Sequence, residues 1–185
     1  MTAPVWVGES LKLGISKAEC GTSTPVTDEE LTITTTFFNS EAKPATIKSI
    51  TYAIGGETIG TVTDSIALAA SSTQDVEFKY TPTKARIMTV KITAVIEQDG
   101  KEYTFTKDVT LDVLDASKLV YIGIDASHYN EYVAGNYKDS MGNFGELAAE
   151  YSVRTVMLKT SEELIAACGN PKYKAIILTA PSRRL

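Results

Sequence analysis

Residues 31–39 read Leu-Thr-Ile-Thr-Thr-Thr-Phe-Phe-Asn, and the apolar positions Leu31, Ile33 and Phe37 are separated by threonines. Successive side chains of a β-strand point to opposite faces, so a period of two predicts a strand with one buried and one solvated face. The same alternation recurs over residues 50–54, 76–80, 88–96 and 103–113. The first part of the chain is therefore predicted to be antiparallel β structure.

Turn residues separate these stretches. Gly55-Gly56 and Asp99-Gly100 are typical of two-residue hairpin turns, which need positive φ at their central residues. Pro82 cannot donate a ladder hydrogen bond and predicts the end of the strand before it. With an opening strand at residues 11–16, about seven strands fall within roughly a hundred residues, the number typical of an immunoglobulin-like β-sandwich.

Four short motifs in this part of the chain carry a resemblance. They are Leu-x-Ile-x-x-x-Phe-x-Asn at residues 31–39, Gly-Gly-Glu at 55–57, Phe-x-Tyr-Thr-Pro at 78–82 and Gly-Lys-Glu-Tyr at 100–103. Over about residues 10–114, their arrangement resembles the adhesion-related CARDB-type immunoglobulin-like modules of bacteria. The resemblance implies a non-catalytic spacer in a secreted or surface-attached protein. It carries over the fold and the setting, and no individual residues.

The pattern changes near Asp115. Residues 119–124 form a continuous apolar run, which is typical of a strand buried on both faces of a parallel sheet. Helical spacing follows, with Asp139 or Ser140 as the predicted N-cap. The apolar face of this helix is predicted to consist of Phe144, Leu147, Ala148 and Tyr151.

A second helix and two more strands complete this part. Residues 154–158 and 174–179 read as strands, and between them Thr160 and Glu163 have the spacing of a capping box. Gly169 is predicted to end the helix. The order β-α-β-α-β predicts the opening of a doubly wound parallel sheet.

This layout resembles the class I glutamine-amidotransferase-like and ThuA-like α/β domains over about residues 118–184. An amidotransferase places a Cys directly after the third strand, whereas residues 180–184 read Ala-Pro-Ser-Arg-Arg. The resemblance therefore implies a fold layout and transfers no catalytic residue.

The predicted fold is thus a mixed two-domain chain, with an immunoglobulin-like sandwich at residues 1–115 and a truncated α/β domain at 116–185. The charge divides in the same way, with 10 Lys+Arg against 16 Asp+Glu through Asp115, and 8 against 7 after it. Three strands leave one sheet edge open, which is poor for solubility. We therefore expect the natural chain to continue beyond Arg184, or the open edge to mediate self-association.

Composition narrows the function classes. The net charge of −5 opposes non-specific binding to nucleic acid or to an anionic membrane. No apolar stretch approaches the roughly 20 residues of a membrane span, and residues 1–9 lack the features of a signal peptide. Cys20 and Cys168 are predicted to be free, buried thiols. Without a clustered set of ligands, we expect neither a metal nor a cofactor.

The candidate site is the loop after the first strand of the α/β domain, because ligands of open α/β sheets bind outside the carboxyl ends of strands. Asp125, Ser127 and His128, the only histidine, are the candidate catalytic residues. The alternative interpretation is that Asp125 and Ser127 make turn hydrogen bonds, with His128 at the surface. The candidate ligand-binding residues are Asn130, Tyr129 and Tyr132.

Three functions follow from these observations. The first is a non-catalytic spacer or adhesion-type module of a larger secreted or cell-surface bacterial protein. Its partners would be other domains of the same chain, or protein or polysaccharide at the cell surface. The second is a hydrolase whose site forms at the strand ends of the complete α/β domain. The third is carbohydrate binding by the tyrosine-bearing loop.

Overall fold

The computed structural model describes residues 12–129 and 131–179, and the chain divides into two compact units. The first unit comprises Met1–Gly21, Glu30–Tyr80 and Ile87–Leu111. The second comprises Thr22–Glu29, Thr81–Arg86 and Asp112–Leu185. The second unit therefore includes two short segments that are joined at both ends to strands of the first.

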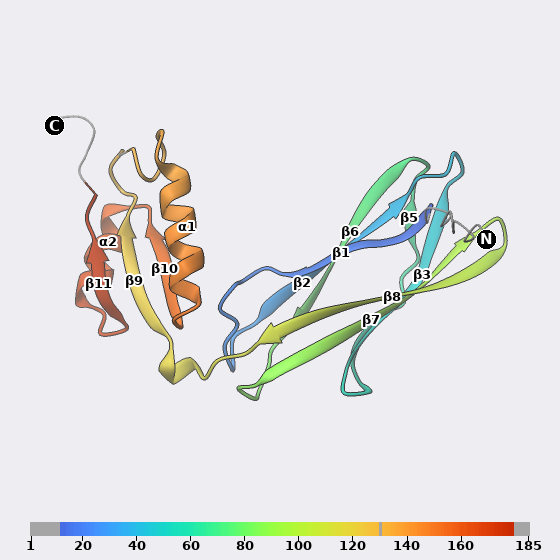
Figure 1. Ribbon diagram of the computed structural model, residues 1–185, viewed down its shortest axis with the longest axis horizontal. Helices are drawn as coiled ribbons and strands as arrows, with labels where there is room; N and C mark the ends of the chain where they lie inside the picture. The colour runs from blue at the N-terminus through green and yellow to red at the C-terminus, as the bar shows by residue number, and fades with distance from the viewer. Residues whose placement is uncertain (1–11, 130, 180–185) are drawn as a thin grey trace, which may run out of the picture. The chain divides into compact units, whose positions relative to one another are not determined.

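The described part of the first unit contains two antiparallel sheets (Figure 1). One has the order β1-β2-β6, and the other has the order β4-β3-β7-β8 with β5 paired to β3. The strands are β1 Leu13–Cys20, β2 Leu31–Asn39, β3 Ala45–Ile54, β4 Glu57–Val62, β5 Ile66–Leu68, β6 Ser72–Tyr80, β7 Ile87–Gln98 and β8 Lys101–Asp112.

The two sheets share a core built from the predicted alternation. Every second residue of β2 is buried, as is every second residue of β7 from Met88 to Ile96. Tyr52 of β3 joins the sheets, because its ring stacks on Phe78 of β6 at 4.1 Å between centroids. Its hydroxyl lies 3.4 Å from Oγ1 of Thr35 in β2. These contacts confirm a β-rich sandwich core.

Both predicted hairpin turns are present. Gly55 and Gly56 have φ angles of 59° and 89°, and Asp99 and Gly100 have 54° and 74°. Positive φ at both central residues matches the right-handed twist of the flanking strands. These turns set the β3–β4 and β7–β8 pairings and hence the inward-facing positions.

The start of β1 and the end of β8 lie at opposite ends of the first unit. β1 begins where β2 ends, because Leu13 pairs with Asn39 and the Ser40 amide donates to the Lys12 carbonyl at 2.7 Å. The β7–β8 turn lies at this same end, where Lys43 pairs with Asp99 at 2.7 Å. β8 then runs twelve residues away from it. The chain consequently enters and leaves at opposite ends.

The second unit holds a small parallel sheet with the order β10-β9-β11 and two helices (Figure 1). Its elements are a short 3-10 helix Ala116–Lys118, β9 Val120–Asp125, α1 Lys138–Ala149, β10 Val153–Leu158, α2 Ser161–Gly169 and β11 Tyr173–Ile177. The predicted β-α-β-α-β order is confirmed. The crossover from β9 and the crossover from β10 run in opposite directions, so their right-handedness places α1 and α2 on opposite faces.

Helix α1 differs from the prediction in two respects. Its N-cap is Tyr137, so the predicted N-cap at Asp139 or Ser140 is wrong and both residues lie inside the helix. Its predicted apolar face is also wrong in part, because Leu147 is 55% and Tyr151 74% exposed. Ala148 is buried, and Met141, Phe144 and Gly145 are partly buried.

The close approach of α1 to β10 explains why a different set of its residues faces the sheet. A Cβ atom at Gly145 would lie only 3.0 Å from Oγ1 of Thr155 in β10, so the glycine lets the helix meet the strand. The predicted capping box of α2 is confirmed, since the Glu163 amide donates to Thr160 Oγ1 at 3.1 Å and the Thr160 amide to Glu163 Oε2 at 3.3 Å. Both cysteines are free, but Cys20 is only partly buried and Cys168 is exposed, so the prediction that both are buried is wrong.

Candidate functional site

The predicted catalytic residues lie at the C-terminal end of the central strand of the parallel sheet. Asp125 is the last residue of β9, and Ser127 and His128 follow in the loop toward α1. The sheet order makes the space between β9 and β11 the point at which successive crossovers leave in opposite directions. Open α/β sheets bind ligands at this switch point. The site residues therefore occupy the position that the fold favours for a ligand.

The structure brings Asp125, Ser127 and His128 into mutual contact. Oδ1 of Asp125 accepts hydrogen bonds from the Ser127 amide at 2.9 Å and from its hydroxyl at 2.6 Å. Nδ1 of His128 lies 2.9 Å from Ser127 Oγ and 3.3 Å from Asp125 Oδ2. Asp125 is only 6% exposed, whereas the His128 side chain is 48% exposed. The arrangement is thus a buried acid beneath an accessible imidazole.

The pKa of Asp125 reflects opposing effects. Burial raises the pKa of this carboxyl, but the Ser127 hydroxyl and amide, followed by His128, lower it by bonding to the charged form. The net result is a pKa below the usual value of 3.8. Asp125 is therefore an ionised acceptor at neutral pH.

Another Asp-Ala-Ser segment, residues 115–117, shows which features of residues 125–127 belong to a local turn and which are particular to the candidate site. Asp115 Oδ1 accepts from the Ser117 amide at 2.9 Å and from its hydroxyl at 2.7 Å, nearly the same geometry as at Asp125 and Ser127. The Asp125–Ser127 hydrogen bonds alone are therefore those of a local turn. The features found only at residues 125–127 are the burial of the Asp125 carboxylate and the neighbouring His128.

The predicted ligand-binding residues are only partly described. Asn130 lies outside the described residues. Tyr129 and Tyr132 are 58% and 41% exposed, and Tyr132 stacks on Tyr137 with 5.4 Å between ring centroids. Tyr121, by contrast, is buried beside Tyr173, so it belongs to the core and not to the loop surface.

Thr179, two residues beyond β11, had no predicted role of its own. Its Oγ1 atom is buried without a hydrogen-bond partner among the described residues. β11 pairs with β9 at Ile177 and Ile124, so Thr179 lies at the same edge of the sheet as Asp125. Its place at the end of the third predicted strand was the only signal in the sequence.

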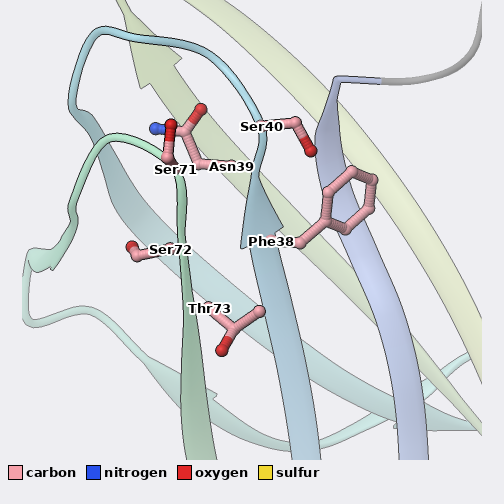
Figure 2. Close-up of a pocket in the computed structure, with 6 residues that line it drawn as sticks. All are labelled: Phe38, Asn39, Ser40, Ser71, Ser72 and Thr73. Carbon is pink, nitrogen blue, oxygen red and sulfur yellow. The ribbon is translucent and has the colours of Figure 1, made fainter.

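Two depressions lie elsewhere in the described residues. One, of about 480 Å³, is formed by the end of β2 and the start of β6 (Figure 2). Asn39 lines it, but its Nδ2 already donates to the carbonyls of Lys43 at 2.8 Å and Ala69 at 3.0 Å, and its Oδ1 accepts from the Glu41 amide. Asn39 therefore secures two loops. The other depression, of about 320 Å³, lies between α2 and β10.

Within residues 12–129 and 131–179, no three His, Cys, Asp or Glu side chains gather closely enough to hold a metal ion. No helix in the same described ranges is long and apolar enough to cross a membrane.

No protein-family model matches the sequence, and no curated protein matches it significantly. Among solved structures, a Paenibacillus cycloisomaltooligosaccharide glucanotransferase is 16% identical with a TM-score of 0.42, over 76% of this chain and 19% of that chain. A cell-surface protein domain from Methanosarcina acetivorans is 18% identical with a TM-score of 0.43, over 56% of this chain and 94% of that domain. These distant likenesses assign no activity, ligand or partner.

Proposed function

We propose that the first unit is a non-catalytic spacer or adhesion-type interaction module of a larger secreted or surface-attached bacterial protein. The observation that carries this proposal is the path of the chain, which enters at one end of the sandwich and leaves at the other. The CARDB-type resemblance of its motifs supports the same function. In this function the sandwich presents the α/β domain, and surface protein or polysaccharide is the partner class.

The strand lengths suit this function. β7 and β8 each contain 12 residues, so at about 3.3 Å per residue the sandwich spans about 40 Å. Three of the four outward positions of β2 are threonines and the fourth is Phe38, whereas the inward positions are buried in the core. A sandwich whose two ends lie far apart can hold neighbouring domains at a distance, and this function needs no catalytic residues.

Distance measurements by electron spin resonance test the spacer. Nitroxides at Lys12→Cys and Thr110→Cys, with Cys20 and Cys168 replaced by Ser, are expected to give one narrow distribution at about 30–40 Å, from the strand rise. The matched pair Lys12→Cys and Asp99→Cys lies at one end and should give a shorter distance. A broad distribution for the first pair would show that the unit does not hold its ends apart.

A second candidate function is hydrolysis by the complete α/β domain. The observation that favours it is the mutual contact of Asp125, Ser127 and His128 at the switch point. In the full natural chain, His128→Ala should abolish activity and leave the melting temperature nearly unchanged. An unchanged rate would remove this function.

Carbohydrate binding is a third candidate, supported by the exposed rings of Tyr129, Tyr132 and Tyr137. Aromatic rings present an apolar face with a polar tip, which suits a sugar. Binding of this chain to a glycan array should weaken in Tyr129→Ala. The absence of binding by the unmodified chain would exclude the idea.

A further inference from the structure

We propose that Asp125 and Ser127 hold His128 in the tautomer that carries its proton on Nδ1, so that Nε2 accepts a proton from a ligand hydroxyl or a water molecule. The ligand lies at the C-terminal ends of β9 and β11, and its class is a hydroxyl-bearing molecule or an activated water. The proposal rests on the hydrolase function only for the presence of that ligand, because the tautomer exists without it.

The direction of the hydrogen bonds fixes the tautomer. An ionised carboxylate only accepts, so Ser127 Oγ, 2.6 Å from Asp125 Oδ1, donates its single proton there. The oxygen of Ser127 then accepts from Nδ1 of His128 at 2.9 Å, which requires the proton to be on Nδ1. Nδ1 also faces Asp125 Oδ2 at 3.3 Å, a second acceptor for the same proton.

The same geometry makes Ser127 a positioning residue and not a nucleophile. In a hydrolytic triad the serine bonds to one ring nitrogen and the acid to the other. Here serine and acid share Nδ1, and Nε2 lies on the side of the ring away from them. In the proton transfer, the O–H bond of the ligand breaks, its electron pair stays on oxygen and an N–H bond forms at Nε2. The resulting imidazolium faces the Asp125 carboxylate.

Thr179 is a second observation that favours a polar ligand at the C-terminal ends of β9 and β11. Its buried Oγ1 has no hydrogen-bond partner among the described residues, and the β9–β11 register places it beside the end of β9. A buried hydroxyl without a partner is costly, and a bound hydroxyl group would satisfy it. Thr179 is therefore a second polar group at the end of the sheet where the proposed ligand lies.

The tautomer can be measured directly, because His128 is the only histidine. In the ¹⁵N-labelled chain, at a pH where the ring is neutral, long-range ¹H–¹⁵N spectra should show the proton on Nδ1. Ser127→Ala should shift the population toward Nε2–H, Asp125→Asn should shift it further, and Ser127→Thr should retain the original form. Ser117→Ala removes the matching hydroxyl of the other Asp-Ala-Ser turn and should change nothing.

A spectrum with the proton on Nε2 in the unmodified chain would overturn the proposal, as would variants that leave the tautomer unmoved. Diethyl pyrocarbonate, which acylates an unprotonated imidazole nitrogen, tests the second part. Modification is expected at Nε2 and severalfold faster than in Ser127→Ala; equal rates would contradict the role of Ser127. Failure of the hydrolase function would appear instead as activity that persists in His128→Ala. The tautomer measured in the unmodified chain would still be the one proposed.

Discussion

Asp125 links the candidate site to the pH dependence of stability. Its pKa is lower in the folded chain than the usual 3.8, because bonds from Ser127 and His128 outweigh burial. A group with a lowered folded pKa contributes stability above its unfolded pKa, and this is lost as pH falls through the folded pKa. The free energy of unfolding should therefore decrease on acidification below about 3.8.

Asp125→Asn isolates this contribution. At neutral pH the variant should be less stable by about 1–3 kcal/mol, because Ser127 and His128 lose a charged acceptor. The difference from the unmodified chain should shrink as pH falls below 3.8, since protonation removes the same charge. Urea unfolding at several pH values measures it, with a substitution of the exposed carboxylate at the end of β8, Asp112→Asn, as the control. A difference that stays constant with pH would contradict the charged role of Asp125.

The place of the candidate residues at the end of a strand was predictable, but their mutual geometry was not. The position of Asp125, Ser127 and His128 after an apolar run was enough to place them at a strand end. Which ring nitrogen faces Asp125 depends on the loop conformation, and no spacing rule specifies this. Thr179 could not be selected either, because its lack of a partner arises from the packing around it.

At the scale of elements, the cap of α2 decides how well that helix begins. Thr160 and Glu163 bond reciprocally to each other's amides. Thr160→Ala removes one side of this box and should lower the free energy of unfolding of the second unit by about 1 kcal/mol. Ser161→Ala, in the first turn with an exposed side chain, is the matched control and should be nearly neutral. Equal losses in chemical denaturation would show that the box is not the cause.

Elements with strong local signals were predicted best. The hairpin turns and the capping box depend on a few adjacent residues, so the sequence was sufficient for them. The orientation of α1 depends instead on its contact with β10 at Gly145 and Thr155, residues far apart in sequence. Hydrophobic spacing therefore predicted the helix, but it assigned Leu147 and Tyr151 to the wrong side.

At the scale of the whole molecule, the composition change near Asp115 indicated two parts of different fold class. The structure adds that Thr22–Glu29 and Thr81–Arg86 group with the second unit, although strands of the first flank them in sequence. A pass along the chain could not show this, because these loops carry no α/β pattern. Their Val26 is a buried member of the apolar cluster with Leu119 and Tyr121.

This connectivity predicts an asymmetric coupling of stability. Gly60 of β4 lies under Phe78, and a Cβ there would meet the ring at 2.3 Å, so Gly60→Ala should destabilise the first unit by about 1–3 kcal/mol. Unfolding the first unit would release the two segments that the second unit needs. Helix α2, by contrast, lies in sequence between β10 and β11, which both belong to the second unit.

Calorimetry should therefore resolve different responses to the two substitutions. Gly60→Ala is expected to lower the transitions of both units, whereas Thr160→Ala should lower only that of the second, by about 4–8 °C for a loss of 1 kcal/mol. Gly142→Ala serves as the control for adding a methyl group, because its Cβ meets nothing within 4 Å and the helix should gain about 1 kcal/mol. If Gly60→Ala left the second transition unmoved, residues 22–29 and 81–86 would contribute nothing to that unit, since a unit that keeps its stability when these segments are released does not depend on their contacts.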